Sequence, residues 1–391
     1  MNKIYLDHAA TTPLDATVER AMQPYLINEF ANPSSVYGAA RATRLAVEDA
    51  RATVADILGA KTTEIIFTSG GTEGDNLAVQ GVLRAAGHGS HWVTTAIEHD
   101  AVLGQVEPLN RQGFSATIVN VGEDGIVAAG AVDAAITDKT VLVSVMLANN
   151  EIGTLQPVAD IAKVIGRIRL KRIEQGIERP LYLHADACQA AGYLSLQVTR
   201  LGVDLMTING SKIYGPKGVG ALFVRHGVAL EPLMYGGGQE RGRRSGTENV
   251  AAIVGLAAAL RQVTTGREAE SRRLSELRDS LISGIQQAVP DALLNGDAKR
   301  RLANNLNFII PGVEGEALVL YLDNAGILAS TGSACSSGSL EPSHVLMAIG
   351  RSRQQAQQSL RLTLGRASDK AVVDKVLEVL PGIIARLREI G

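Results

Sequence analysis

Short runs that are apolar throughout recur along the first half of this chain, each followed by a helical or loop-like pattern. They are Ile65–Thr68, Trp92–Thr95, Thr117–Val119, Val141–Val145 and Leu181–His184. A strand that is apolar on both sides must be covered on both faces, and helical connections make successive strands parallel. The pattern therefore predicts an α/β fold in which a mostly parallel sheet lies between helices.

A polar turn that contains Lys212 lies between the next two apolar runs, Val203–Ile208 and Ala221–Val224. Gly210 and Gly215 on either side let the backbone pass close to whatever the lysine faces. A lysine enclosed by strand ends loses hydration, so its pKa falls and its amine becomes a Schiff-base nucleophile for a carbonyl cofactor. Taken alone, a solvated lysine in a hairpin is the simpler interpretation. The other strand ends decide against it.

Ligands bind beyond the carboxyl ends of the strands in an open α/β sheet, and here those ends carry polar residues. Gly70, Gly71 and Thr72 follow the first strand and start a helix, which suits either a bound anion or a plain helix cap. His99 follows the second strand and can stack on a planar ring and move protons, or merely cap the next helix.

Further along the chain, Asn149 and Asn150 follow a strand, where a ligand contact and a structural turn are both plausible. Asp186, with Gln189 close behind it, follows the Leu181–His184 strand. A carboxylate there can pair with a ring N–H⁺ and keep a pyridinium charged as an electron sink, although such aspartates also cap helices. Polar residues at successive strand ends, followed by Lys212, are hard to ascribe to capping alone.

The two cysteines stand in different surroundings. Small hydrophilic residues surround Cys335, in a stretch without apolar neighbours to bury it, as a nucleophilic cysteine on an accessible loop requires. Cys188 has no such setting, and we interpret it as a packed bystander. Two cysteines cannot form a disulfide framework, which favours a reducing compartment.

The overall charge excludes several classes of partner. The 38 basic residues are balanced by 40 acidic ones, so neither nucleic acid nor an anionic membrane is an expected partner. No apolar run is long enough to span a bilayer, and the N-terminus lacks a signal-peptide core. We therefore expect a cytoplasmic protein.

The rest of the chain predicts a smaller α+β domain. A helical region is expected from about Asn249 to Val289, and the strand-like runs that follow it are Asn305–Ile310, Ile327–Ala329 and Leu360–Thr363. We expect a large domain over residues 15–255 and a small domain made of 1–14 and 256–391, with a mobile cysteine loop at about 328–341. Near the N-terminus, a helix should start at about Asp15, and Ser34 or Ser35 should cap a second helix that ends near Leu58.

Taken together, these residues resemble the cysteine desulfurases of the NifS/IscS type, pyridoxal-phosphate enzymes of fold type I in the class V aminotransferase family. The resemblance covers nearly the whole chain. The motifs that carry it are Tyr5–Pro13, Phe67–Glu73, Asn149–Gly153, Lys212–Gly218, Gly236–Thr247, Gly332–His344 and Arg361–Arg366. It implies a large domain with a mostly parallel seven-stranded sheet between helices, and a smaller α+β domain.

The resemblance also implies a role for each matching residue. Lys212 would be the Schiff-base lysine, His99 would stack on the cofactor ring and take part in catalysis, and Cys335 would be the sulfur-accepting nucleophile. The other expected cofactor contacts are Gly71, Thr72, Asn150, Asp186, Gln189, Asn209, Ser211 and, from the partner subunit, Thr247. Arg361, helped by Asn32, would bind the substrate carboxylate. The family usually has Ser-Gly-His before the lysine, whereas this chain has Asn209, Gly210 and Ser211.

The implied activity is removal of sulfur from L-cysteine with pyridoxal 5′-phosphate, giving L-alanine and a persulfide on Cys335. That sulfur would pass to an acceptor or iron–sulfur scaffold protein for the synthesis of iron–sulfur clusters or other sulfur-containing cofactors. Through its persulfide, Cys335 is also a candidate for a transient iron–sulfur ligand. The resemblance further implies a homodimer with shared sites. A selenocysteine lyase, or another class V pyridoxal-phosphate enzyme, is the alternative.

Overall fold

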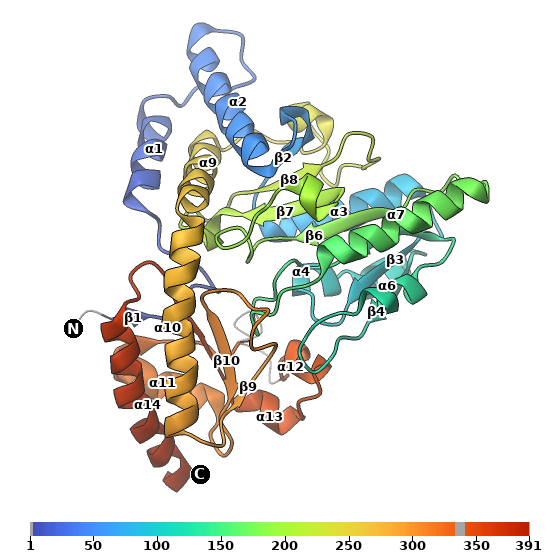
Figure 1. The fold of residues 1–391 in the computed structure, drawn as a ribbon. Coiled ribbons are helices and arrows are strands. Elements are labelled where there is room, and N and C mark those ends of the chain that lie inside the picture. The colour runs from blue at the N-terminus through green and yellow to red at the C-terminus, as the bar shows by residue number, and fades with distance from the viewer. Residues whose placement is uncertain (1–2, 333–340, 391) are drawn as a thin grey trace.

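A seven-stranded sheet forms the centre of the computed structural model, which describes residues 3–332 and 341–390 (Figure 1). In spatial order its strands are β2 (Ile65–Thr68), β8 (Gly220–Val224), β7 (Leu205–Asn209), β6 (Tyr182–Asp186), β5 (Thr140–Ser144), β3 (His91–Thr95) and β4 (Ser115–Val119). All neighbours are parallel except β8, which is antiparallel to both β7 and β2. The connection from β7 to β8 is too short for a crossover, which explains the reversal.

Helices cover both faces of this sheet, as the fully apolar strands predicted. One face packs against α3 (Gly71–Ala86), α4 (Asp100–Leu103) and α5 (Val106–Arg111). The other face packs against α1 (Ala16–Ile27), α2 (Gly38–Leu58), α6 (Ala129–Ala135), α7 (Val158–Glu174), α8 (Val198–Leu201) and α9 (Val250–Thr265). Successive strand residues alternate between the two faces of this sheet, so Ile66 packs on one face and Phe67 on the other.

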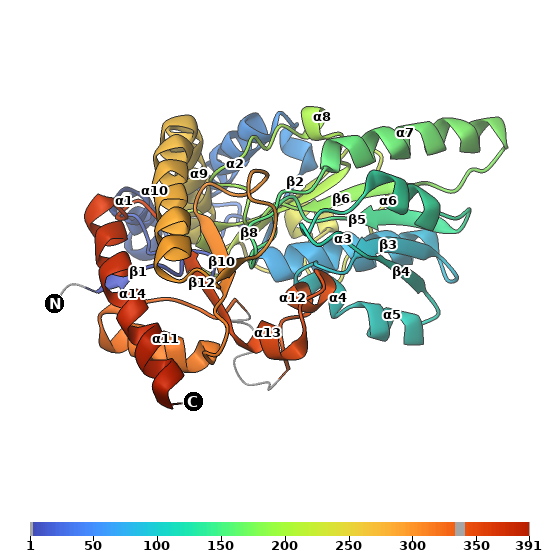
Figure 2. The same cartoon turned by 60° about the horizontal axis from the view of Figure 1, so that its bottom comes forward.

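A second hydrophobic core lies beside a small antiparallel sheet. The sheet has the order β12 (Ser359–Thr363), β10 (Asn305–Ile309), β9 (Leu293–Leu294), and near it β1 (Ile4–Tyr5) pairs in parallel with β11 (Ile327–Leu328). The helices packed there are α10 (Arg267–Ala288), α11 (Gly315–Asn324) and α14 (Lys370–Ile390). In Figure 2, α12 (His344–Ala348) and α13 (Arg353–Gln357) lie between this sheet and α4.

The expectation of an α/β fold with a mostly parallel seven-stranded sheet is confirmed. Among the described residues, short 3₁₀ turns form at η1 (Thr62–Glu64), η2 (Gly210–Lys212) and η3 (Gln239–Gly242). A helix starts near Asp15 as predicted, since α1 begins at Ala16, and the Asp15 carboxylate caps it by accepting from Thr17 N–H at 2.7 Å. Over the described ranges 3–332 and 341–390, no helix combines the length and the apolar character that crossing a membrane requires.

One local expectation was wrong. Neither Ser34 nor Ser35 caps α2, which begins at Gly38 after an N-cap at Tyr37 that makes no side-chain cap bond. The Asn32 side chain accepts from Ser34 N–H at 2.9 Å, and this turn delays the helix. The helical region expected from about Asn249 to Val289 is confirmed, and it consists of two helices, α9 and α10, which meet at Gly266.

One buried carboxyl group, that of Glu98, links two strand ends at the edge where ligands are expected. Its Oε1 accepts from Thr95 Oγ1 at 2.7 Å and from Met146 N–H at 2.9 Å. Its Oε2 has no hydrogen-bond partner among the described residues. Burial therefore outweighs the two hydrogen bonds and raises the pKa of Glu98 from its ordinary 4.5 to about 8.

This pKa predicts how stability depends on pH. Between pH 4.5 and 8 the folded protein keeps a proton on Glu98 that the unfolded chain has lost, so stability falls as pH rises through this window. Glu98→Gln removes the titration while its amide oxygen still accepts both bonds. From pH 6 to 8.5 the wild type should lose on the order of 2 kcal/mol more stability than the variant. Melting temperatures of both proteins across this range test the expectation, and parallel curves would contradict it.

Candidate active site

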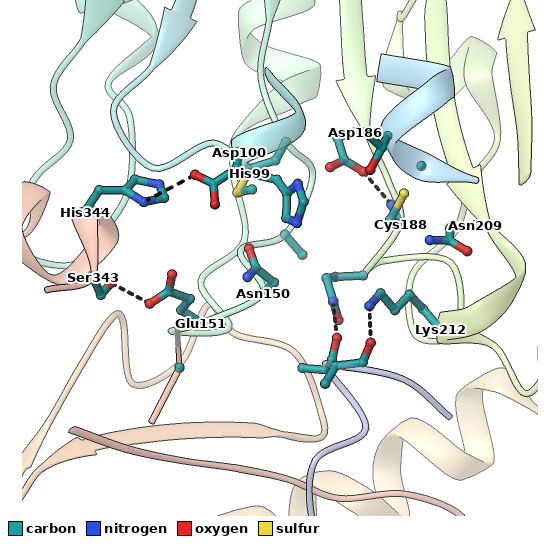
Figure 3. Close-up of a pocket in the computed structure, with 18 of the residues that line it drawn as sticks. His99, Asp100, Asn150, Glu151, Asp186, Cys188, Asn209, Lys212, Ser343 and His344 are labelled. Atoms are coloured by element: carbon teal, nitrogen blue, oxygen red, sulfur yellow. Dashed lines mark hydrogen bonds and ion pairs between the residues drawn. The ribbon is translucent and has the colours of Figure 1, made fainter. Parts of the chain in front are cut away.

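A cavity of about 550 Å³ opens at the edge where the parallel strands end (Figure 3). Parallel strands place their carboxyl ends at one edge, so residues far apart in the chain meet there. The residues of the sequence prediction that line the cavity are Gly71, Thr72, His99, Asn150, Asp186, Gln189, Asn209, Lys212 and Arg361. The structure thus brings these side chains together, and their individual roles stay predictions.

The other predicted residues do not line this cavity. Asn32 and Thr247 are exposed, and neither reaches the site within one chain. Ser211 lines a smaller hollow beside it, together with Gly71 and Thr72. Cys335, with its proposed nucleophilic and iron–sulfur ligand roles, lies outside the described residues.

Lys212 ends the 3₁₀ turn η2, directly after β7. Asn209 starts this turn, and its side-chain oxygen accepts from Ser211 N–H at 2.9 Å. Gly210 is needed here because a Cβ on it would lie 2.8 Å from Pro216 O. The Lys212 ammonium donates a hydrogen bond to Ala10 O, in the N-terminal segment. The hairpin and the N-terminal segment therefore hold the amine at the cavity, as Figure 3 shows.

The N-terminus of α3 forms one wall of the cavity. The helix begins at Gly71, after Gly70, whose φ of 153° favours glycine. A Cβ on Gly71 would lie only 2.8 Å from Cys188 Sγ, so only glycine lets the helix end come this close to the β6 loop. The free N–H groups and the dipole of a 16-residue helix favour an anion at this position.

Asp186 ends β6, and two buried groups lie behind it. Its Oδ1 accepts from Cys188 N–H at 2.9 Å. Burial raises the pKa of Asp75 well above its ordinary value, and the neighbouring charge of Asp186 raises it further. The ring of His184 hydrogen-bonds to Ser144 Oγ at 2.9 Å and to Thr207 Oγ1 at 3.0 Å, and burial lowers its pKa to about 4. His184 is therefore neutral at physiological pH and fixes the strand ends rather than carrying protons.

Cys188 lines the cavity. The sequence analysis interpreted it as a packed bystander and did not predict this position. The residue is buried, in agreement with that interpretation. Burial, followed by the charges of Asp186 and Asp75, raises the pKa of its thiol well above the ordinary value. A thiol held in its protonated form is a poor nucleophile.

His99 caps α4 and also faces the cavity, so both interpretations of this residue describe its position. Its Nδ1 accepts from Ala101 N–H at 3.0 Å, and the neutral ring therefore carries its proton on Nε2. Gln189, which also lines the cavity, donates from Nε2 to Ala9 O at 2.9 Å. Local hydrogen bonds thus fix the orientation of both side chains.

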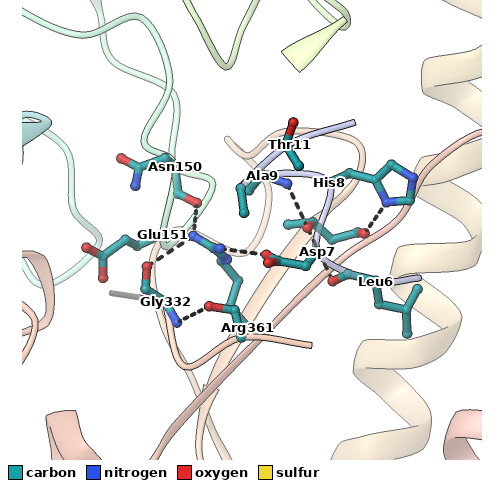
Figure 4. A network of polar contacts seen from close by, with 12 residues as sticks. Leu6, Asp7, His8, Ala9, Thr11, Asn150, Glu151, Gly332 and Arg361 are labelled. Atoms are coloured by element: carbon teal, nitrogen blue, oxygen red, sulfur yellow. Dashed lines mark hydrogen bonds and ion pairs between the residues drawn. The ribbon is translucent and has the colours of Figure 1, made fainter. Parts of the chain in front are cut away.

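Arg361 comes from β12 of the small sheet and reaches the same cavity (Figure 4). Its guanidinium forms an ion pair with Asp7 at 2.7 Å and donates to Asn150 O at 3.2 Å and Gly332 O at 3.1 Å. Asp7 belonged to a recognised motif, but nothing in the local sequence pattern paired it with a residue more than 350 positions away. Asp75 was missed as well, because it looks like an ordinary polar residue of an amphipathic helix.

The donor set fits pyridoxal phosphate. A helix N-terminus suits the phosphate, the Lys212 amine suits the aldehyde, and Asp186 suits the ring nitrogen. The buried pair Asp75 and Asp186 also favours a cation, because two adjacent carboxyl groups cannot both ionise cheaply without one.

Comparison with known proteins gives matches along the whole chain. The aminotransferase class-V family model matches residues 4–376. Cysteine desulfurase IscS of Clostridium botulinum is 46% identical over 395 aligned positions, which span 100% of this chain and 97% of that protein. A solved structure named NifS-like protein superposes with a TM-score of 0.89 at 33% identity, over 98% of this chain and 100% of that one. SspA in complex with cysteine gives a TM-score of 0.79 at 33% identity, over 92% and 98%.

The family match and the relatives agree with the geometry of the cavity. A lysine, an aspartate and a helix N-terminus that meet at the strand ends fit the cofactor of this family. The chain therefore belongs to the aminotransferase class-V family, among its pyridoxal-phosphate-dependent cysteine desulfurases.

Proposed function

We propose that this enzyme transfers the sulfur of L-cysteine to Cys335 and then to an acceptor protein. The observation that carries the proposal is that Lys212 and Asp186, from neighbouring strands, face one cavity that Arg361 enters from the other sheet. When bound, pyridoxal phosphate supplies an aldehyde that holds the substrate amine and a ring that accepts electrons from its Cα–H bond.

Each of the predicted site residues at the cavity then has a role that its position supports. Arg361 binds the substrate carboxylate, and Lys212 Nζ removes the proton from the substrate Cα. Asp186 holds the protonated ring nitrogen, and His99, with its proton on Nε2, covers the ring. The N-terminus of α3 holds the phosphate. Gln189, Asn150 and Asn209 complete the contacts, and Ser211 stands where the family usually has histidine.

The sulfur step requires a second nucleophile. The Cys335 thiolate attacks the substrate sulfur, an S–S bond forms as the substrate C–S bond breaks, and the electron pair goes to Cβ, which takes up one proton to become the methyl group of alanine. The persulfide then passes its terminal sulfur to an acceptor, which uses it for iron–sulfur clusters or other sulfur-containing cofactors. A cytoplasmic compartment suits a free catalytic thiol.

A homodimer is part of the proposal. Between α1 and α2 the structure exposes a group of large apolar side chains, among them Ile27, Phe30 and Val36, with exposed fractions of 73%, 83% and 101%. Patches of this kind mark interfaces. Thr247 is exposed and outside the cavity of its own chain, which suits a residue that serves the site of the partner. We also propose that the two cores belong to two domains, 15–255 and 1–14 with 256–391.

Lys212→Ala tests the cofactor chemistry. Purified wild type should be yellow, and the variant should lose the lysine-dependent visible band and at least about a thousandfold of its activity, since the base and covalent anchor are gone. Lys217→Ala is the control, because Lys217 binds Thr12 O at 2.7 Å but does not line the cavity, and it should keep the band. A visible band of wild-type strength in Lys212→Ala would overturn the assignment.

Cys335→Ser tests the sulfur step. The variant should still give the spectral change on adding L-cysteine but should form no alanine and no persulfide, because sulfur transfer comes after substrate binding. Mass spectrometry should find one extra sulfur atom on the Cys335 peptide of the wild type and of Cys188→Ser, whose thiol is buried and protonated. Full alanine production by Cys335→Ser would exclude Cys335 as the nucleophile.

Subunit complementation tests the shared sites. Lys212→Ala destroys the site of its own chain, and Thr247→Asp should destroy the partner's site by placing a negative charge next to the phosphate. A mixed dimer of the two variants then contains one intact site and should recover up to about half of wild-type activity. Sedimentation confirms that each variant is dimeric. No recovery would mean that Thr247 serves its own chain.

A further inference from the structure

The buried ion pair between Arg361 and Asp7 joins the substrate side of the cavity to the N-terminal segment (Figure 4). The Arg361 side chain is 2% exposed and the Asp7 side chain 19%. Asp7 lies beside β12, because it forms a parallel bridge with Thr363. It does not line the cavity, so it stands behind Arg361 as seen from a bound substrate.

The hydrogen bonds of Arg361 already have protein acceptors. Nη2 donates to Asp7 Oδ1, and Nη1 donates to Asn150 O and Gly332 O. Nε has no hydrogen-bond partner among the described residues. A substrate carboxylate therefore meets a guanidinium whose charge is already opposed by a carboxylate and whose N–H groups are partly in use.

Other charges nearby have their own partners. The Glu151 carboxylate accepts from Ser343 Oγ at 2.5 Å, and across the part of the chain that the structure describes it forms no ion pair with Arg361. Asp7 is thus the residue that opposes the charge of Arg361 within these ranges. A similar ion pair joins Asp15, just after this segment, to Arg366, just after β12, at 2.9 Å. Asp15 does not line the cavity and therefore serves as the control.

We propose that Asp7 is a positioning residue that holds Arg361 toward the cavity and lowers the affinity of Arg361 for the substrate carboxylate. The inference rests on the proposed function, in which substrate cysteine and product alanine carry the same carboxylate. Carboxylate binding energy is then uniform along the reaction, so it holds the product as firmly as the substrate. A built-in counter-charge keeps Arg361 in place while letting alanine leave.

Asp7→Asn separates charge from position. The amide oxygen still accepts from Arg361, but the negative charge is gone, so a carboxylate ligand gains attraction and loses repulsion. Calorimetry with L-alanine on the cofactor-loaded variant should give a dissociation constant about tenfold lower than for wild type. The KM for L-cysteine should fall in parallel while kcat does not rise, and Asp15→Asn should change neither quantity.

Cysteamine, which is cysteine without its carboxylate, shows whether the effect acts through Arg361. Its binding to wild type and Asp7→Asn should be the same. Equal or weaker alanine binding by Asp7→Asn, or an equal gain for cysteamine, overturns the proposal. If Asp7→Asn does not fold, Asp7→Ser, which also removes the charge, is measured against the same outcomes. Failure of the proposed function would appear separately, as wild type that releases no alanine from cysteine.

Discussion

The N-terminal segment, residues 5–12, is hydrogen-bonded to both sheets at the cavity. Thr12 donates to Ser211 O from its backbone at 2.8 Å and its side chain at 3.0 Å, in the turn that presents Lys212. Lys212 itself donates to Ala10 O, and Asp7 pairs with Arg361 at the other end. One short piece of chain therefore sets the separation of the amine and the guanidinium. A substrate that uses both groups depends on that spacing, because misplacement of either one slows the reaction.

Burial near the cavity controls the charge of the titratable groups Glu98, Asp75 and His184. Burial raises the pKa of Asp75 well above its ordinary value and that of Glu98 to about 8, so near neutral pH Glu98 favours its protonated form. Burial lowers the pKa of His184, so this side chain is neutral as well. A ring N–H⁺ placed against Asp186 then meets few competing charges. Low-dielectric surroundings would strengthen that contact, which in the proposed function keeps the electron-accepting form of the cofactor.

The sequence allowed prediction of those features that local patterns encode. Apolar runs predicted the strands, and because parallel strands end at one edge of a sheet, the sequence also predicted that Asp186 and His99 lie at that edge. The start of α2 was missed because the Asn32 turn, not a serine cap, decides it. The partner of Arg361 was missed for a different reason. The pairing joins residues at opposite ends of the chain, and local periodicity carries no information about such contacts.

The two cysteines show why position decides function more than residue type does. A thiol near Asp186 and Asp75 cannot ionise easily, since burial and two acidic neighbours raise its pKa. The acidic groups proposed to stabilise a protonated cofactor ring therefore disfavour a thiolate at the same place. A sulfur-accepting cysteine has to lie away from these groups, where it has access to solvent and to an acceptor. The electrostatics that suit the proposed role of Lys212 thus disfavour Cys188 as the sulfur nucleophile, in agreement with the proposal that a separate segment supplies it.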